Sequence, residues 1–220
     1  MRSVSRRGLA LSTALAAVAG YVDAIGFLGT GGLFVSFMSG NSTQAAVGLV
    51  EGEFGFALFG LSLVGAFVLG VIAGALLNAL HASHPQSLIL WMAAGAMLAS
   101  TVWGLTPWAS SWRFVVVAAA MGILNTLFLA EGRARIAVTY ATGTLVTLGI
   151  GIADAMTGRG AGSAWRRPLL LWGALAGGGG VGALGVVMLG DIASLAAVVA
   201  LAGLAVVVWW RYRPTVAGRP

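Results

Sequence analysis

The chain has 220 residues, of which 59% are hydrophobic and only 8% charged, and its mean hydropathy is +0.97. Soluble domains carry about 25% charged residues, so this composition excludes an ordinary water-soluble fold. The net charge is +6, and every basic residue is an arginine. The arginines lie at the chain ends and between apolar runs, as in membrane proteins that obey the positive-inside rule, so a nucleic-acid partner is not expected.

About six apolar runs follow one another, and each is long enough to cross a bilayer as a helix. They cover approximately residues 9–29, 54–79, 86–105, 111–130, 167–189 and 192–210. Two further segments, 33–50 and 136–153, are apolar at their ends and polar in the middle. The pattern predicts an all-α, polytopic transmembrane helical bundle in which residues 1–220 form a single integral membrane domain surrounded by lipid.

The first polar segment contains the stretch FVSFMSGNSTQ, residues 34–44. A polar break in the backbone is tolerated inside a bilayer only where protein or a water-filled cavity surrounds it. Such a break offers backbone groups and neutral side chains that could bind a small polar solute or ion. The candidate binding residues here are Ser39, Gly40, Asn41 and Thr43.

The second polar segment contains TYATGT, residues 139–144, which repeats this pattern. Aligning the two segments places Asp23 opposite Asn125 and Ser39-Gly40-Asn41 opposite Thr142-Gly143-Thr144. We therefore expect two repeats, at about 9–105 and 111–210, each with one polar-centred segment. Asn125, Thr142, Gly143 and Thr144 are the candidate binding residues of the second repeat.

Two membrane layouts remain open from the sequence. If both polar segments cross the bilayer, the chain makes about eight crossings; if both are re-entrant or broken helices, it makes about six. The second layout leaves only Arg113 on the outer side, which suits the positive-inside rule slightly better. It also makes the repeats inverted copies, an arrangement that in transporters places the binding site between the repeats. We expect this layout, with both termini in the cytoplasm.

Asp23 lies within the first apolar run, with no basic residue nearby in sequence. A carboxylate at this depth is costly unless it is protonated, paired or hydrated. Asp23 could carry a proton, bind a cation or accept a hydrogen bond from a substrate. Alternatively, it could bond to a neighbouring helix or cap a broken segment without any ligand.

Glycine makes up 34 of the 220 residues. Gly70 and Gly74, Gly173 and Gly177, and Gly178 and Gly182 each form a G-x-x-x-G spacing, which lets membrane helices approach closely. Packing within one chain is the favoured interpretation, although a homo-oligomer stays open.

No set of catalytic residues is apparent, so an enzyme is not expected. The chain has neither lysine nor cysteine, and its two histidines, His81 and His84, lie in one short loop. These absences leave no Gly-rich loop with a lysine, no thiol nucleophile and no His-Glu-x-x-His site. We predict no cofactor and no metal centre.

The stretch GYVDAIGFL followed by FVSFMSGNSTQAAVGL, between residues 20 and 49, resembles the signature of the YoaK-like family of bacterial membrane proteins. The second motif, VTYATGTLVTLG, is similar to that family's second motif. Ser39 replaces the usual threonine and keeps the hydroxyl. The resemblance covers the whole chain and implies a bacterial inner-membrane protein, but the family has a domain of unknown function and implies no substrate.

Two functions follow as hypotheses. The chain is expected to be a small-solute or ion transporter or channel, with a polar site between its two repeats. The alternative is a structural or accessory membrane protein whose packed polar centre binds no ligand. A cavity that reaches Asp23 favours the first hypothesis, and a closed core favours the second.

Overall fold

The computed structural model describes residues 6–80, 85–127, 129–130, 133–134, 141–159 and 162–212. The prediction of an all-helical membrane protein is confirmed, since the only strands described are two two-residue strands paired as a hairpin. The elements in chain order are α1 (Arg6–Thr30), α2 (Met38–Glu51), α3 (Phe54–Leu80), α4 (Pro85–Gly104), α5 (Arg113–Leu124), β1 (Leu129–Ala130), β2 (Arg133–Ala134), α6 (Ala141–Thr157), α7 (Arg166–Leu189), the short 3-10 helix η1 (Gly190–Ala193) and α8 (Ser194–Tyr212).

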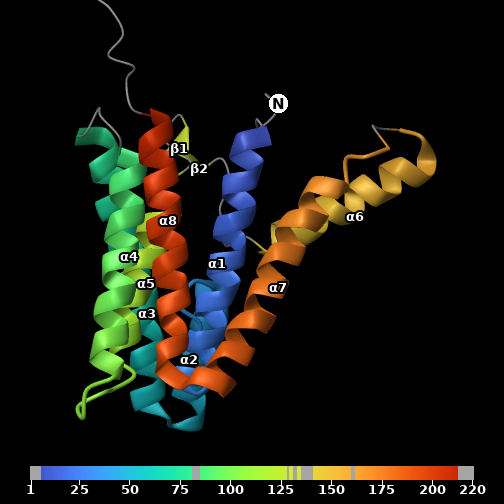
Figure 1. Cartoon of the computed structure of the whole chain (residues 1–220). Coiled ribbons are helices and arrows are strands. Elements are labelled where there is room, and N and C mark those ends of the chain that lie inside the picture. The colour runs from blue at the N-terminus through green and yellow to red at the C-terminus, as the bar shows by residue number, and fades with distance from the viewer. Residues whose placement is uncertain are drawn as a thin grey trace, which may run out of the picture.

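The long helices α1, α3, α4, α7 and α8 run along the bundle, and α1 begins at the same end at which α8 finishes (Figure 1). Among the described residues, four stretches are long and apolar enough to cross a membrane: 8–30, 54–80, 85–104 and 166–211. The last stretch contains both α7 and α8, which η1 joins at the end of the bundle opposite to the termini (Figure 1). The predicted runs 9–29, 54–79 and 86–105 therefore coincide closely with helices.

The predicted run 111–130 differs most from the structure. Its helix α5 has only 12 residues and ends at Leu124, after which Asn125, Thr126 and Leu127 form a turn. The hydroxyl of Thr126 donates to the carbonyl of Ile123 at 2.7 Å, satisfying one of the carbonyls that a helix end leaves free. Only two polar residues interrupt the apolar run here, and apolar residues resume at Leu127, so the hydropathy pattern did not locate the helix end.

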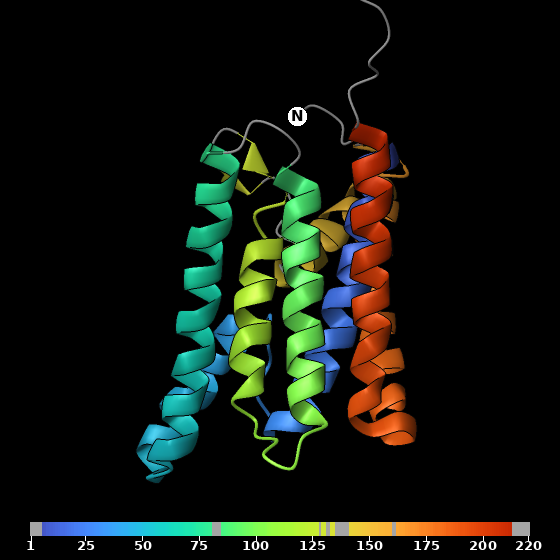
Figure 2. The ribbon, with the colours of Figure 1, turned by 60° about the vertical axis from the view of Figure 1, so that its left-hand side comes forward.

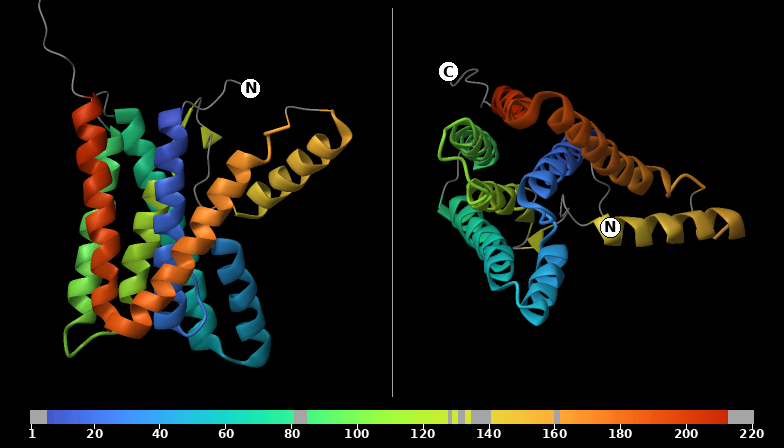
Figure 3. Two further views of the ribbon diagram at one scale, coloured as in Figure 1. Left: turned by 45° about the vertical axis from the view of Figure 1, so that its right-hand side comes forward. Right: turned by 90° about the horizontal axis from the view of Figure 1, so that it is seen from below.

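The first polar segment leaves α1 and returns as a hairpin (Figure 3). Gly31 and Gly32 have φ values of 77° and 130°, a region that other residues rarely adopt, and they end α1. Residues 33–37 have no regular structure, and α2 then leads to the end of the bundle at which α3 begins (Figure 3). Because α1 ends and α3 begins at the same end, residues 31–51 do not cross the bundle.

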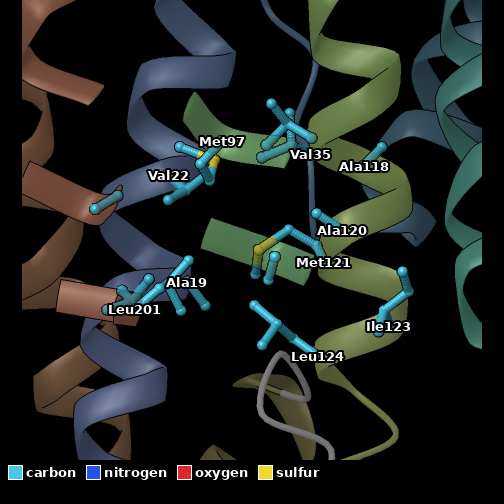
Figure 4. Packing of buried hydrophobic residues seen from close by; sticks show 14 of the residues in the cluster. Ala19, Val22, Val35, Met97, Ala118, Ala120, Met121, Ile123, Leu124 and Leu201 are labelled. Atoms are coloured by element: carbon cyan, nitrogen blue, oxygen red, sulfur yellow. The ribbon is translucent and has the colours of Figure 1, made fainter. Parts of the chain in front are cut away.

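The hydrophobic core lies where α1, α4, α5 and α8 face one another. Its side chains are almost completely buried, and Figure 4 shows Val22, Met97, Met121 and Leu201 converging from these four helices. Small residues such as Ala19 fill the space between the larger side chains (Figure 4). This core is made by helices from both halves of the chain, so the halves share one packed interior.

The outer surface of the bundle is strongly apolar. Large aliphatic side chains on α3, α7 and α8 are widely exposed, for example Leu69 at 67%, Val187 at 80% and Val199 at 70%. A soluble monomer rarely exposes so much contiguous apolar surface. These helix faces are compatible with contact with the lipid bilayer.

Two pairs of helices touch through glycine. The first pair is α1 and α7, in which an added Cβ at any of three glycines would collide with a backbone carbonyl of the opposite helix: Gly20 with Leu175, Gly178 with Ala17, and Gly182 with Tyr21. Such contacts bring two backbones closer than any side chain permits. The predicted packing role of Gly178 and Gly182 is therefore seen within one chain.

The second pair is α3 and α5, which lie side by side in Figure 2. Here the three glycines also face backbone or short polar groups: Gly70 faces the carbonyl of Ala119, Gly122 faces that of Phe67, and Gly74 faces Thr126 and Ile123. By contrast, a Cβ added at Gly173 or Gly177 would meet nothing within 4 Å. Within the described part of the chain, the spacing of Gly173 and Gly177 therefore serves no close contact between helices.

Helix α6 stands apart from the others. It packs against α7 and projects away from the bundle (Figure 3), and Gly151 is its only fully buried residue within the described part of the chain. Helix α2 is held more closely, with Asn41, Ala45 and Gly48 buried against α3. The two helices of the polar segments thus adopt different positions relative to the bundle.

Candidate functional site

Asp23 is bonded to the hairpin that follows its own helix. Its Oδ1 accepts hydrogen bonds from the backbone N–H groups of Val35 at 2.9 Å and Ser36 at 2.7 Å. Its Oδ2 accepts a hydrogen bond from the hydroxyl of Ser36 at 2.5 Å. The carboxylate therefore ties the non-helical residues of the hairpin to α1, and it satisfies backbone donors that the bilayer could not satisfy.

Asn41 makes a second tie inside the hairpin. Its side chain is fully buried, its Oδ1 accepts from the N–H of Phe34 at 2.8 Å, and its Nδ2 donates to the carbonyl of Phe34 at 2.6 Å. The amide thus pairs with both backbone groups of one residue, as a neighbouring strand would. Asp23 and Asn41 together explain how a polar, non-helical segment persists in an apolar chain.

The other predicted residues of this segment lie in the first turns of α2. The side chains of Ser39 and Thr43 are exposed, and the Thr43 hydroxyl donates to the Ser39 carbonyl at 3.1 Å. Gly40 packs against aromatic rings, because an added Cβ would lie 3.3 Å from the ring of Phe34 and closer still to that of Phe37. None of these three residues lines the described cavity that contains Asp23.

In the second polar segment, residues 136–140 lie outside the described part of the chain. The two histidines of the loop between α3 and α4, His81 and His84, also lie outside it. Asn125 follows the last residue of α5 and donates to the carbonyl of Met121 at 2.8 Å. Thr142, Gly143 and Thr144 lie in the first turn of α6, where the Gly143 carbonyl accepts from Thr147 at 2.8 Å. Thr142, Gly143 and Thr144 thus lie at the start of a short helix, as Ser39 and Thr43 do in α2.

A cavity of about 540 Å³ lies between α1, α6, α7 and the hairpin. It brings Asp23 and Thr142, one candidate residue from each half, into the walls of one space. The remaining candidates do not line it: Ser39, Gly40, Asn41, Thr43, Asn125, Gly143 and Thr144. The lining residues are Gly20, Asp23, Ala24, Phe27, Leu28, Phe34, Phe37, Ala141, Thr142, Leu145, Leu175, Ala176, Gly179 and Ala183.

The cavity is more apolar than the sequence pattern suggests. Among its lining residues only Asp23 and Thr142 have polar side chains. The physical reason is that the amide of Asn41 is bonded to Phe34 within the hairpin, and the hydroxyl of Ser36 donates to Asp23. Polar residue types in the sequence thus indicate where the backbone breaks, and they do not indicate which groups face the cavity.

Three aromatic rings beside Asp23 are a feature that the sequence reasoning missed. The rings of Phe27 and Phe34 are tilted by 40° with centroids 5.0 Å apart, and those of Phe34 and Phe37 meet edge to face at 5.4 Å. All three line the cavity. Their positions on either side of the helix break were visible in the sequence, where they looked like ordinary apolar residues.

An ion pair with a largely buried arginine was also missed. Arg113 at the start of α5 bonds to Asp191 in η1, at the end of the bundle opposite to the termini (Figure 1). The side chain of Arg113 is 11% exposed and also lies over the ring of Phe114, at 4.8 Å from the centroid. Arg113 and Asp191 are 78 positions apart in the sequence, so no local spacing indicates that they pair.

Within the described ranges, no three His, Cys, Asp or Glu side chains lie close enough together to hold a metal ion. The chemistry available at the cavity is therefore that of one carboxylate, one hydroxyl and several apolar and aromatic surfaces.

Comparison with known proteins gives a family and a relative. Residues 11–208 match the family model described as "Protein of unknown function (DUF1275)". A UPF0700 transmembrane protein from Rhizobium meliloti (strain 1021) is 35% identical over 155 residues. That alignment covers 69% of this chain and 66% of the relative, slightly less than two thirds of its length. No solved structure matches.

Proposed function

Since the chain belongs to the DUF1275 family of membrane proteins, which includes the YoaK-like proteins it resembles, we propose that it is a small-solute or ion transporter or channel. One observation carries the proposal. The cavity beside Asp23 is lined by both polar segments, with Phe34 and Phe37 from the first and Ala141, Thr142 and Leu145 from the second. A purely structural polar centre requires no such space.

The relation between the two helix pairs supports an inverted repeat. The glycine contacts between α1 and α7 correspond to those between α5 and α3. Adding 102 to a residue number in α1 gives the equivalent residue in α5, and subtracting 108 from a number in α7 gives the equivalent residue in α3. This operation takes Gly20 to Gly122, Gly178 to Gly70 and Gly182 to Gly74. It also takes the facing carbonyls of Ala17 and Leu175 to those of Ala119 and Phe67.

Direction adds to this support. Helix α1 runs from the end of the bundle with the termini toward the other end, and α5 runs the opposite way (Figure 2). Two halves with equivalent contacts and opposite directions are what an inverted repeat predicts. In transporters of that kind, the substrate site lies between the repeats, which is where the cavity lies.

We further propose a bacterial inner-membrane location with both termini in the cytoplasm. Arg6 and Arg211 lie on helices whose terminal ends share one end of the bundle (Figure 1), whereas Arg113 is paired with Asp191 at the opposite end. The positive-inside rule then assigns the end with the termini to the cytoplasm.

A ligand-free structural role is the second candidate. The hydrogen bonds of Asp23 and Asn41 favour this structural role, because both side chains already have partners within the protein. Asp23 accepts from Val35 and Ser36, and Asn41 pairs with the backbone of Phe34. Under this alternative, the cavity is a packing gap that stays closed to water.

Cysteine labelling separates the two candidates. The chain has no native cysteine, so Thr142→Cys would carry the only thiol. In sealed vesicles of each orientation, a transporter exposes this thiol to a membrane-impermeant maleimide from both sides in turn. Ala118→Cys, placed in the core at a fully buried position, is the control that should stay unlabelled. Protection of Thr142→Cys from either side would contradict transport by alternating access.

A further inference from the structure

We propose that the cavity between α1, α6 and α7 binds an organic cation, a molecule with an apolar body and one positively charged centre. The inference rests on the proposed function, because it names the class of molecule that the transport site takes. Three features carry it: the carboxylate of Asp23, the aromatic rings beside it and the apolar character of the other walls.

The carboxylate of Asp23 lines the cavity. It is held by hydrogen bonds from Val35 and Ser36, and the backbone N–H of Phe37 also interacts with it. All of these partners are neutral, so they leave the charge of the carboxylate uncancelled. Asp23 is half-buried, so a ligand in the cavity can approach this charge. A carboxylate attracts cations and hydrogen-bond donors and repels anions.

The aromatic rings favour a positive charge at the same place. Phe27, Phe34 and Phe37 line the cavity together with Asp23, and their rings form one cluster with centroids 5.0 and 5.4 Å apart in successive pairs. The face of an aromatic ring attracts a cation within about 6 Å of its centroid, and more strongly where water is excluded. A carboxylate and three rings together offset part of the cost of removing a cation from water.

The remaining walls select an apolar body. Leu28, Leu145 and Leu175 line the space, and alanine and glycine residues complete it. Among the described lining residues there is no basic side chain that would repel a cation. Apart from Asp23, the only polar side chain is that of Thr142, and it is uncharged. A small, strongly hydrated ion would find too few ligands here, whereas a lipophilic cation fits the whole lining.

The test uses two probes of the same shape and opposite charge. Tetraphenylphosphonium is the lipophilic cation, and tetraphenylborate is the matching anion. Equilibrium dialysis of each probe against the purified full-length protein in dodecyl maltoside measures binding, with protein-free micelles as the blank. We expect saturable binding of tetraphenylphosphonium and none of tetraphenylborate.

Asp23→Asn removes the charge and preserves the hydrogen-bonding geometry. The amide oxygen can accept from the N–H groups of Val35 and Ser36, and the amide nitrogen can donate to the Ser36 hydroxyl. The second half already has Asn125 at the aligned position. We expect this variant to fold and to bind tetraphenylphosphonium about tenfold or more weakly, because it loses the charge-assisted contact.

A second variant keeps Asp23 intact and fills the cavity. Ala176 lines the cavity and is exposed, so Ala176→Phe can occupy the space with little strain. We expect it to abolish binding of tetraphenylphosphonium. Gly173→Phe, on the same helix α7 with open space around it, is the matched control that should bind like the natural protein.

Three results would overturn the inference: equal binding of the cation and the anion, unchanged binding by Asp23→Asn, or unchanged binding by Ala176→Phe. Transport is read separately as tetraphenylphosphonium flux in proteoliposomes. Binding without flux would refute the transport proposal and leave the cation site standing. Labelling of Thr142→Cys from both sides without any cation binding would refute the cation site and leave transport standing.

Discussion

The buried amide of Asn41 gives the sharpest stability prediction. Asn41→Ala removes both hydrogen bonds to the backbone of Phe34, at 2.8 and 2.6 Å, in a position with no solvent exposure. Each buried backbone group left without a partner costs about 1–3 kcal/mol, so two such groups cost about 2–6 kcal/mol. We expect the unfolding free energy in detergent to fall by that amount, as measured by tryptophan fluorescence during denaturant titration.

The matched control is Thr43→Ala in the same helix. Thr43 is exposed, and its hydroxyl bonds only to the Ser39 carbonyl in the described structure, so its loss should change stability by about 0.5 kcal/mol or less. Asn41→Asp refines the test, because it keeps the acceptor for the Phe34 N–H but turns an oxygen toward the Phe34 carbonyl. Equal stability of Asn41→Ala and Thr43→Ala would refute the idea that Asn41 holds the hairpin together.

Two further predictions concern helix contacts. Gly20→Ala and Gly122→Ala should each lower the apparent melting temperature by a similar amount, because each added Cβ collides with a backbone carbonyl of the opposite helix. The control Gly173→Ala should not lower it, because its Cβ meets open space. A lower melting temperature for only one of the first two variants would contradict the equivalence of the two helix pairs. For the ion pair, Asp191→Ala should cost about 1–3 kcal/mol because it leaves the buried guanidinium of Arg113 unpaired, and Arg113→Met should cost less because the acid is 41% exposed. The reverse order in chemical denaturation would show that the arginine is not effectively buried.

Much of the fold could be predicted from the sequence, because long apolar runs depend only on composition. The run 54–79 differs from α3 by a single residue at its end. The end of α5 could not be predicted from hydropathy, because the two polar residues after it, Asn125 and Thr126, are followed by further apolar residues such as Leu127. Length and hydropathy indicate where lipid can surround a helix, and they do not locate a turn that is covered by other helices.

The candidate site was predictable in part. Asp23 and Thr142 were singled out by their polar character in an apolar chain, and both line the cavity. Asn41 was singled out for the same reason, yet its amide turns inward to the backbone of Phe34. Side-chain direction depends on the path of the hairpin, and no spacing in the sequence reports that path. The aromatic lining was overlooked because phenylalanine is common in membrane helices.

The close contact between α1 and α7 has a consequence for the order in which the protein assembles. A chain is synthesised from its N-terminus, so α1 enters the membrane long before Gly178 and Gly182, its closest partners, exist. The bonds from Asp23 to Val35 and Ser36 span only 12 and 13 residues, and they can form at once. The Asp23 carboxylate thus has hydrogen-bond partners before the second half of the chain is synthesised.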